Sequence, residues 1–228
     1  RSRGLGDVYK RQALGLGINR ETLVSAVLSG HARAAQFPVS PVSPLYPAEL
    51  ESLYSYDDFA AAMEAAGLNT GRTRTVTLLV NQENTFKASA AEHIAQALSD
   101  FDLQIQVEAL PWEEYAAALA AGNFDLYLGQ VTLTGDFDLA PLLSSSGSLN
   151  YGRWQDALGD ALLSALQGAQ GDARTQAAAD LFAYLNQQAP IVPVCFKNGS
   201  VLTQWSRLSG LSPVRGNVFY QLENWNLS

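Results

Sequence analysis

The sequence has little of the chemistry that depends on cysteine or histidine. It holds one cysteine, Cys195, and two histidines among 228 residues. A single thiol excludes an internal disulfide, and no cysteine-rich or histidine-rich spacing points to zinc. Cys195 lies in the apolar run 191–196, which predicts a buried, unreactive thiol. We therefore expect no metal site and no cofactor.

Basic residues and long apolar runs are scarce as well. Lys and Arg number 14 against 22 Asp and Glu, which gives a net charge of −8. Recognition of nucleic-acid phosphates needs clustered Lys and Arg, so this balance argues against a nucleic-acid partner and favours solubility. No apolar run reaches the roughly 20 residues of a membrane-spanning helix, and no signal segment is recognised. The hydrophobic share of 47% is ordinary for a globular protein with a sizeable core.

Residues 1–12 (RSRGLGDVYKRQ) have neither a helical nor a strand period. Within them, residues 7–12 resemble the conceptual translation of a transposon end used in preparing sequencing libraries. We therefore expect 1–12 to be a non-native, adapter-derived tail outside the fold, with the native sequence beginning near Ala13. A basic tail without regular structure is the alternative.

From Ala13 onward, helix signals and strand signals alternate. Helices are predicted from the N-cap Asn19 to Gly30 and over 59–66, with an extended proline-rich segment at 37–47 between them. Strands at 75–80, 103–107 and 124–128 then alternate with helices at 88–98 and 111–121. Strands joined through such helices run parallel, because a parallel crossover needs about a dozen residues. The prediction is a parallel-rich βαβαβ sheet flanked by helices, in the α/β class.

Beyond the third strand, the sequence predicts a polar loop, two helices and a pair of strands. The loop spans 130–151, and the helices lie near 155–166 and 172–188. Strands at 191–196 and 200–203 flank Asn198-Gly199, a hairpin turn signal. The chain is thus divided into a tail at 1–12, an α/β lobe at 13–190 and a C-terminal segment at 191–228.

Two carboxylates in the loop 130–151 are the strongest polar signal. Asp136 and Asp138 flank Phe137 beyond the third strand. Loops at the carboxyl ends of parallel strands line the ligand crevice, so these carboxylates are suited to accept hydrogen bonds from a cationic group such as a peptide amine. A solvated turn or a helix cap explains them equally well. General acid–base catalysis also uses two carboxylates, but no phosphate-binding glycine loop and no G-x-S-x-G elbow accompanies them.

Other polar and aromatic residues follow the predicted strands. Asn81 and Gln82 come directly after the first strand, and aromatic side chains such as Trp112 and Tyr127 are suited to contact an organic ligand. No catalytic residue and no metal ligand is predicted. The predicted ligand-binding residues are Asn81, Gln82, Thr132, Thr134, Asp136, Asp138 and Tyr151.

Five weak motifs in a fixed order resemble a family of bacterial transport receptors. They are Ala13-Leu14 with Ile18-Asn19-Arg20 and Leu28-Ser29-Gly30, then Tyr56-Asp57 with 65–68, then 112–115, Phe124-Asp125 and 189–193. In this order they resemble the C-terminal part of the ABC-transporter extracytoplasmic solute-binding proteins of family 5, the peptide/nickel class. The resemblance covers nearly all of residues 13–228.

The resemblance implies a periplasmic-binding-protein-like fold of type II, in which 13–190 form one lobe and 191–228 return toward the other. It implies a non-catalytic component of an ABC importer that closes on a small solute, most simply an oligopeptide, and delivers it to permease subunits. It also implies an extracytoplasmic location, in the periplasm or as a lipoprotein. Membrane contact would come only through a lipid anchor on an N-terminal part that this chain lacks.

The ligand itself is not identified by the resemblance. After the strand that begins with Phe124-Asp125, the family often shows Trp and then Asp-Tyr-x-x-Pro, with that Asp near a bound peptide amine. Here Val131 stands in place of the Trp and Thr134 in place of the Asp, while Asp136 and Asp138 are displaced by a few positions. Two other functions stay open, a small α/β hydrolase-like enzyme using Asp136 or Asp138 and a ligand-sensing domain of a receptor.

Overall fold

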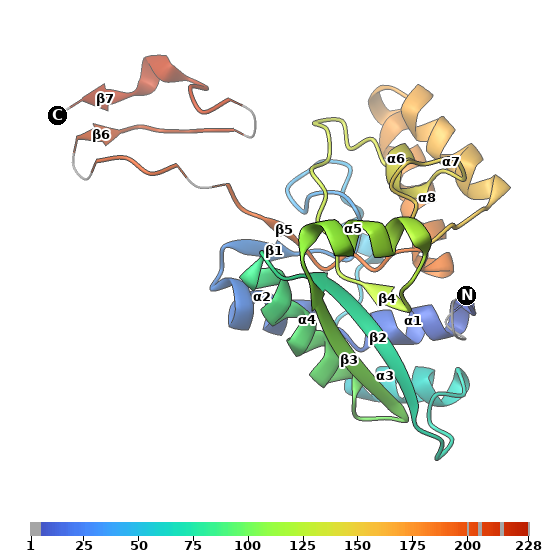
Figure 1. Cartoon of the computed structure of the whole chain (residues 1–228). Helices are drawn as coiled ribbons and strands as arrows, with labels where there is room; N and C mark the ends of the chain where they lie inside the picture. The colour runs from blue at the N-terminus through green and yellow to red at the C-terminus, as the bar shows by residue number, and fades with distance from the viewer. Residues whose placement is uncertain (1–5, 200, 205–206, 215–216, 228) are drawn as a thin grey trace. The chain divides into compact units, whose positions relative to one another are not determined.

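A parallel sheet organises residues 74–127 (Figure 1). Its middle strand, β2 (Arg74–Asn81), lies between β3 (Leu103–Leu110) and β4 (Leu126–Tyr127). β2 pairs with β3 along its whole length and with β4 at Leu78 and Leu79, in parallel on both sides. The predicted βαβαβ unit and the α/β class are therefore confirmed.

The chain separates into two units. The structure, a computed structural model, describes residues 6–199, 201–204, 207–214 and 217–227. The larger unit is Arg1–Phe196 and the smaller is Lys197–Ser228. The functional division at 13–190 and 191–228 stays a prediction.

Helices cover both faces of the parallel sheet. α4 (Thr85–Leu98) connects β2 to β3, and α5 (Trp112–Ala121) connects β3 to β4. Leu78 of β2 is buried in one core with α4, whereas Leu79 is buried in a second cluster with Tyr115 of α5. Successive side chains of a strand point to opposite faces, so the two crossover helices lie on opposite sides of the sheet.

Three helices precede the sheet and complete the core on its α4 side. They are α1 (Val8–Leu16), α2 (Arg20–Leu28) and α3 (Tyr56–Ala65). The predicted cap Asn19 accepts the N–H of Thr22 at 3.0 Å, which satisfies a donor that the first turn of α2 leaves unpaired. Phe59 and Met63 of α3 are fully buried in this core, together with residues of α1, α2 and α4.

α1 begins at Val8, inside the segment predicted to lack regular structure. Arg11 donates to the carbonyl oxygens of Gln188 and Ala189, at 2.8 and 3.0 Å, and Asp7 caps the helix. The prediction of no regular structure was therefore wrong for residues 8–12, because contacts with a distant helix end compensate for a weak local period. The adapter origin of 1–12 stays a prediction, and residues 1–5 lie outside the described chain.

A second core lies around the last helices. α6 (Ala140–Leu143), α7 (Ala157–Gly168) and α8 (Gly171–Gln188) meet there, and the predictions of helices near 155–166 and 172–188 are confirmed. Phe182 of α8 is buried with Phe37, whose ring centroid lies 6.0 Å away. Phe37 belongs to the proline-rich segment, which continues into the short 3-10 helix η1 (Ala48–Leu50). This segment therefore packs against the second core.

The strand predicted at 191–196 pairs with a strand that the sequence does not predict. β5 (Cys195–Lys197) forms a two-stranded sheet with β1 (Ala32–Ala34). The N–H of Ala35 extends the contact by donating to the carbonyl oxygen of Val194 at 3.1 Å. Cys195 is half-buried in this position, so the prediction of a buried thiol was wrong.

The predicted hairpin around Asn198-Gly199 was wrong. Residues 201–203 form no strand in the described chain, and Ser200 lies outside it. A turn signal acts only between neighbouring segments, whereas β5 obtains its partner from a strand more than 150 positions earlier. β5 therefore pairs with the distant β1 and not with a strand at 201–203.

The smaller unit has its own short sheet. β6 (Leu208–Ser209) pairs antiparallel with β7 (Asn226–Leu227), and the 3-10 helix η2 (Leu222–Asn224) precedes β7. Several of its apolar side chains are exposed, including Leu202 and Phe219. Within the described ranges of either unit, no helix is long and apolar enough to cross a membrane.

Candidate ligand-binding site

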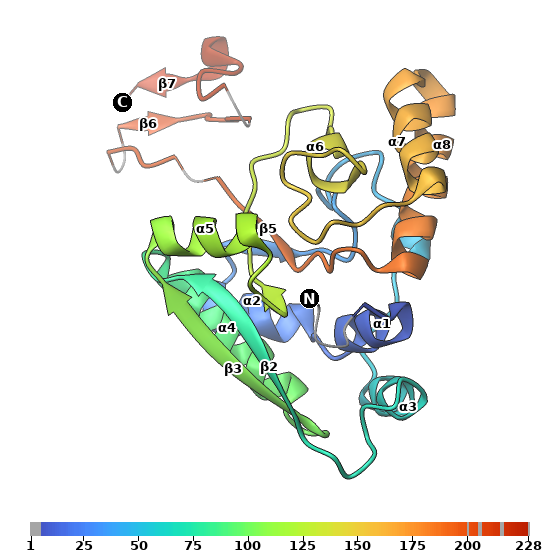
Figure 2. The ribbon, with the colours of Figure 1, turned by 45° about the vertical axis from the view of Figure 1, so that its right-hand side comes forward.

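The carboxyl ends of β2 and β3 meet beside the start of α5 (Figure 2). Asn81, the last residue of β2, is paired in register with Leu110, the last residue of β3. The N–H of Gln82 then donates to the carbonyl oxygen of Leu110 at 2.9 Å and extends the pairing by one residue. Asn81 is buried, with 6% of its surface exposed, whereas Gln82 is exposed. The two predicted residues at this edge therefore differ in their access to solvent.

Glu83 connects the end of β2 to the start of α5. Its Oε1 accepts the N–H of Trp112, the first residue of α5, at 2.8 Å, and its Oε2 accepts from Nδ2 of Asn81 at 3.3 Å. The bond from the Trp112 N–H is the main cause that lowers the pKa of Glu83, so this carboxylate is charged at neutral pH. A negative charge at the first turn also interacts favourably with the helix dipole.

Asn81 keeps one polar atom without a partner. Its Oδ1 is buried and has no hydrogen-bond donor among the described residues. Because a carboxylate only accepts hydrogen bonds, Glu83 requires the amide NH₂ of Asn81 to face it and leaves the oxygen unpaired. An unsatisfied buried acceptor is unfavourable by about 1–3 kcal/mol, so it points to a donor supplied from outside the chain.

Aromatic side chains lie on the α5 side of the sheet. Tyr115 is buried and its hydroxyl donates to the carbonyl oxygen of Leu128 at 3.1 Å. Tyr127 lies with its ring centroid 6.2 Å from that of Tyr151, one of the predicted site residues. Burial raises the pKa of Tyr115 and of Tyr127, so both hydroxyls stay protonated at neutral pH. Trp112, by contrast, is 58% exposed.

The predicted residues of the loop 130–151 form a second group. Oγ1 of Thr134 accepts the N–H of Asp138 at 3.0 Å. Oδ1 of Asp138 accepts the N–H of Ala140, the first residue of α6, at 2.9 Å, and also accepts from Nε2 of Gln167 at 2.8 Å. Asp138 therefore forms a turn directly before the N-cap residue Leu139 and pairs the first N–H of α6, which agrees with the predicted explanation as a turn or cap residue.

Asp136 is held beside this turn by α8. Nη2 of Arg174 donates to the carbonyl oxygen of Asp136 at 2.8 Å, and a hydrogen bond from Thr134 is the main cause that lowers the pKa of the exposed Asp136 carboxyl. A cavity of about 160 Å³ lies here, between the loop and the helices α7 and α8. Its lining is Asp136, Phe137, Asp138, Leu139, Leu163, Leu166, Gln167 and Arg174.

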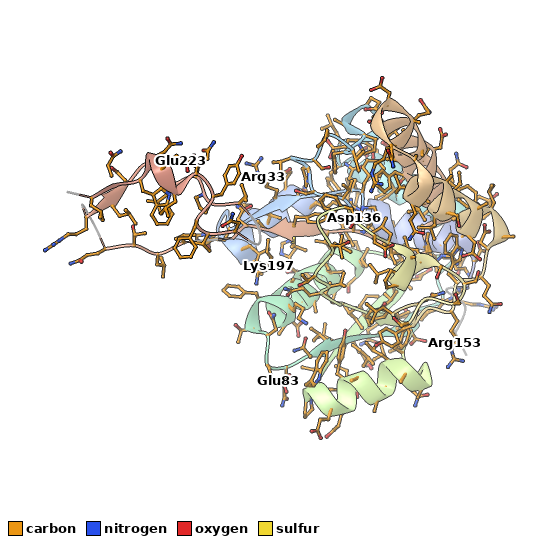
Figure 3. The ribbon with its side chains drawn as sticks, turned by 90° about the horizontal axis from the view of Figure 1, so that it is seen from above. Arg33, Glu83, Asp136, Arg153, Lys197 and Glu223 are labelled. Carbon is orange, nitrogen blue, oxygen red and sulfur yellow. The ribbon has the colours of Figure 1, made fainter. Side chains whose placement is uncertain are left out.

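The predicted site residues thus fall into two groups. Asn81 and Gln82 lie at the strand ends, with Tyr151 against Tyr127, whereas Asp136 is bound to α8 well apart from Glu83 (Figure 3). Thr132 is exposed in the loop between the groups. Of the seven, Asp136 and Asp138 line the cavity beside α8, and the other five do not. Their role in ligand binding stays a prediction.

Sequence reasoning missed Glu83 as a site residue. Its side chain contacts Trp112, which lies 29 positions later. A helical or strand pattern in the sequence covers only neighbouring residues and does not predict such a contact. The usable signal was the register, since parallel strands that end together bring the residue after β2 close to the residue after β3. Figure 3 shows Glu83 near the start of α5 and Arg153 near its other end, where Nη2 of Arg153 donates to Ala121.

Replacing Asp138 tests whether its side chain stabilises the start of α6. We expect Asp138→Ala to lower the free energy of unfolding by about 1 kcal/mol, because the first N–H of α6 loses its acceptor. Asp136→Ala, two positions away, is the control and should lower the urea midpoint less, because the exposed Asp136 carboxyl bonds within the loop and its contact with Arg174 uses the main chain. Urea unfolding followed by circular dichroism measures both. Equal midpoints for the two variants would contradict the assignment.

No group of three or more His, Cys, Asp or Glu side chains in the described part of the chain is arranged to hold a metal ion.

Comparisons with known proteins agree on one family and one fold. The model of the bacterial extracellular solute-binding proteins, family 5 Middle, matches residues 3–151. The oligopeptide-binding protein AppA of Bacillus subtilis (strain 168) is 25% identical over 175 residues, which cover 69% of this chain and 32% of AppA. By sequence, the chain therefore spans about a third of the length of this relative.

Solved structures of similar fold are about twice as long as this chain. AppA from Bacillus subtilis in complex with a nonapeptide gives a TM-score of 0.75 at 20% identity, over 97% of this chain and 48% of AppA. HbpA2 from Haemophilus parasuis gives 0.81 at 21%, over 98% and 46%. NikZ from Campylobacter jejuni in complex with Ni(L-His) gives 0.73 at 18%, over 98% and 49%. At these identities the likeness establishes the periplasmic-binding-protein-like fold.

Proposed function

The chain belongs to family 5 of the bacterial extracellular solute-binding proteins, and we propose that it supplies one lobe of a receptor that captures a small solute for an ABC importer. The match covers residues 3–151, which contain the whole parallel sheet and both crossover helices. In this proposal residues 191–228 help to complete a second lobe, and the solute lies between the two. The receptor works outside the cytoplasmic membrane, held there by a lipid anchor on another part of the protein.

The observation that carries the proposal is the carboxyl edge of the parallel sheet. Ligands of open α/β sheets bind at the carboxyl ends of the strands, and this edge presents the unpaired Oδ1 of Asn81 next to a charged carboxylate. Aromatic surface on Tyr127 and Tyr151 lies on the α5 side of the same sheet. A few polar groups among aromatic side chains are typical of small-molecule sites.

The solute class is not fixed by the family. AppA was solved with a nonapeptide and NikZ with a nickel–histidine complex. We propose a peptide or similar small organic solute, contacted by Asn81, Gln82 and Tyr151 at the strand ends. Thr132 and Thr134, with Asp136 and Asp138, would contribute from the loop if lobe closure brings a solute to it.

A catalytic role is less well supported. Oδ1 of Asp138 already accepts two hydrogen bonds within the chain, from Ala140 and Gln167, which hold the start of α6. The relatives named here are binding proteins, which supports a receptor that releases its solute unchanged. Permease subunits would be its membrane partners.

A thermal-shift screen of the gene product that contains this chain tests the proposal. Peptides, amino acids, sugars and metal chelates are added at increasing concentration, and each solute is recovered and analysed afterwards. We expect one class to raise Tm saturably, since a solute at 100 times its Kd stabilises the folded state by about 2.7 kcal/mol. The isolated 228-residue chain should bind the same class at least tenfold more weakly, because one lobe provides half of the contacts. Chemical conversion of any solute would contradict the receptor.

A further inference from the structure

The group formed by Asn81, Glu83 and Trp112 has properties that select a particular kind of ligand. Asn81 and Glu83 offer oxygen atoms that accept hydrogen bonds. Trp112 donates its main-chain N–H to Glu83 and has an exposed indole ring. The acceptors come from the end of β2 and the ring from the start of α5. All three therefore lie at the edge of the sheet where the solute is proposed to bind.

The two acceptors are fixed by each other. Glu83 takes the NH₂ of Asn81 at 3.3 Å and the N–H of Trp112 at 2.8 Å, one on each carboxylate oxygen. This contact orients the Asn81 amide so that Oδ1 has no partner. Only 6% of the surface of Asn81 is exposed. The Glu83 carboxylate also accepts its own main-chain N–H, so three donors share its roughly four lone pairs. Apart from the indole N–H of Trp112 and the second amide hydrogen of Asn81, the polar atoms that this group presents are acceptors.

The negative charge and the exposed indole ring further narrow the chemical class of the ligand group that fits here. Glu83 is negatively charged, and the first turn of α5 adds the carboxylates of Glu113 and Glu114, while the positive charge of Lys87 acts on Glu83 from α4. Trp112 is 58% exposed, and an indole face attracts ammonium and guanidinium groups. A donor without charge would satisfy Asn81 and leave the other two features unused.

We propose that Asn81, Glu83 and Trp112 form a subsite for a cationic, hydrogen-donating group of the solute, an ammonium or a guanidinium. The ammonium or guanidinium of a lysine-like or arginine-like side chain donates to Oδ1 of Asn81 and to the Glu83 carboxylate, and its alkyl stem or charge contacts the Trp112 ring. This inference rests on the proposed function and names the chemistry of the solute.

A matched pair of blocked tripeptides tests the subsite. Acetyl-Gly-Lys-Gly-amide and acetyl-Gly-norleucine-Gly-amide differ in the terminal ammonium alone, and each is titrated into the ¹⁵N-labelled 228-residue chain at millimolar concentrations. We expect the lysine peptide to bind at least tenfold more tightly. It should shift the side-chain NH₂ signals of Asn81 and the indole N–H signal of Trp112, whereas the norleucine peptide should not.

Variants of two neighbouring carboxylates show which one causes the preference for the lysine peptide. Glu83→Gln retains an acceptor for the Trp112 N–H and removes the charge, so the preference for lysine should fall at least fivefold. Glu113→Gln removes an exposed charge from the same turn and should change the preference by less than twofold. Equal losses in the two variants would mean that only the general negative potential acts, which overturns the subsite.

The affinities of the unsubstituted chain for the two peptides distinguish a failure of the subsite from a failure of the proposed receptor function. Equal affinity for the lysine and norleucine peptides overturns the subsite and leaves the receptor function standing. The same holds if neither peptide binds while another solute class raises Tm saturably. If no solute of any class binds to the chain or to the gene product that contains it, both proposals fail together.

Discussion

Leu98→Ala is expected to lower the free energy of unfolding by about 2–5 kcal/mol, the range for a buried leucine that leaves a cavity. Leu98 ends α4 with 1% of its surface exposed, in the core that α4 shares with β2, β3 and α3. Leu98 packs closely against the main chain of Gly17, since a Cβ built on Gly17 would lie 2.6 Å from Cδ2 of Leu98. Because this core positions β2, its loss also loosens the carboxyl edge.

Leu53→Ala is the matched control for this prediction. The same atoms are removed, but Leu53 is 95% exposed, so stability should change by less than about 0.5 kcal/mol. Urea unfolding followed at 222 nm gives both values, and an unchanged m-value would indicate that the unfolded state is the same. A loss below about 1 kcal/mol for Leu98→Ala would show that the core under the sheet is not packed as described.

Arg20→Met is expected to lower the free energy of unfolding by about 2–3 kcal/mol, because part-buried carbonyl oxygens lose their charged donor. Nε of Arg20 donates to the carbonyl oxygen of Pro193 at 2.8 Å, and Nη1 donates weakly to Gly15 and Ile18 at 3.5 and 3.4 Å. Burial lowers the pKa of Arg20, and the nearby Tyr46 and Glu51 oppose that shift. The side chain thereby holds the start of α2 to the segment that leads into β5.

Arg33→Met provides the comparison for Arg20→Met. Arg33 lies on β1 and is exposed, so its replacement should change stability by less than about 0.5 kcal/mol. Amide hydrogen exchange gives a second measure, since loosening of the Pro193 segment should speed exchange at Ala35, whose N–H donates to Val194. Unchanged exchange at Ala35 together with full stability would contradict the role of Arg20.

Elements with strong local signals were predictable from the sequence. The cap Asn19 and the alternation of strands with helices each act over a few residues, and both are confirmed. β1 and its pairing with β5 were not predictable, because a three-residue strand has almost no period and its partner lies far along the chain. The turn signal at Asn198-Gly199 therefore led to the wrong partner.

The candidate site was predictable in position and less so in composition. Parallel strands imply a ligand edge, and Asn81 and Gln82 were found by that rule. Asp138 illustrates the limit, because a carboxylate after a strand serves equally as a ligand contact or as a turn or cap residue, and only the bonds to Ala140 and Gln167 distinguish them. Glu83 became visible only once the register placed it beside Trp112.

The most direct test of the account is amide hydrogen exchange on the gene product that contains this chain, with and without a saturating solute from the thermal-shift screen. We predict that the solute slows exchange at residues 81–83, 112–115 and 128–134, which lie at or just beyond the carboxyl ends of the three parallel strands. Amides of the outer turns of α2 and α7 should be unchanged. Protection confined to those helices, with none at the strand ends, would contradict the claim that the carboxyl edge of this sheet binds the solute.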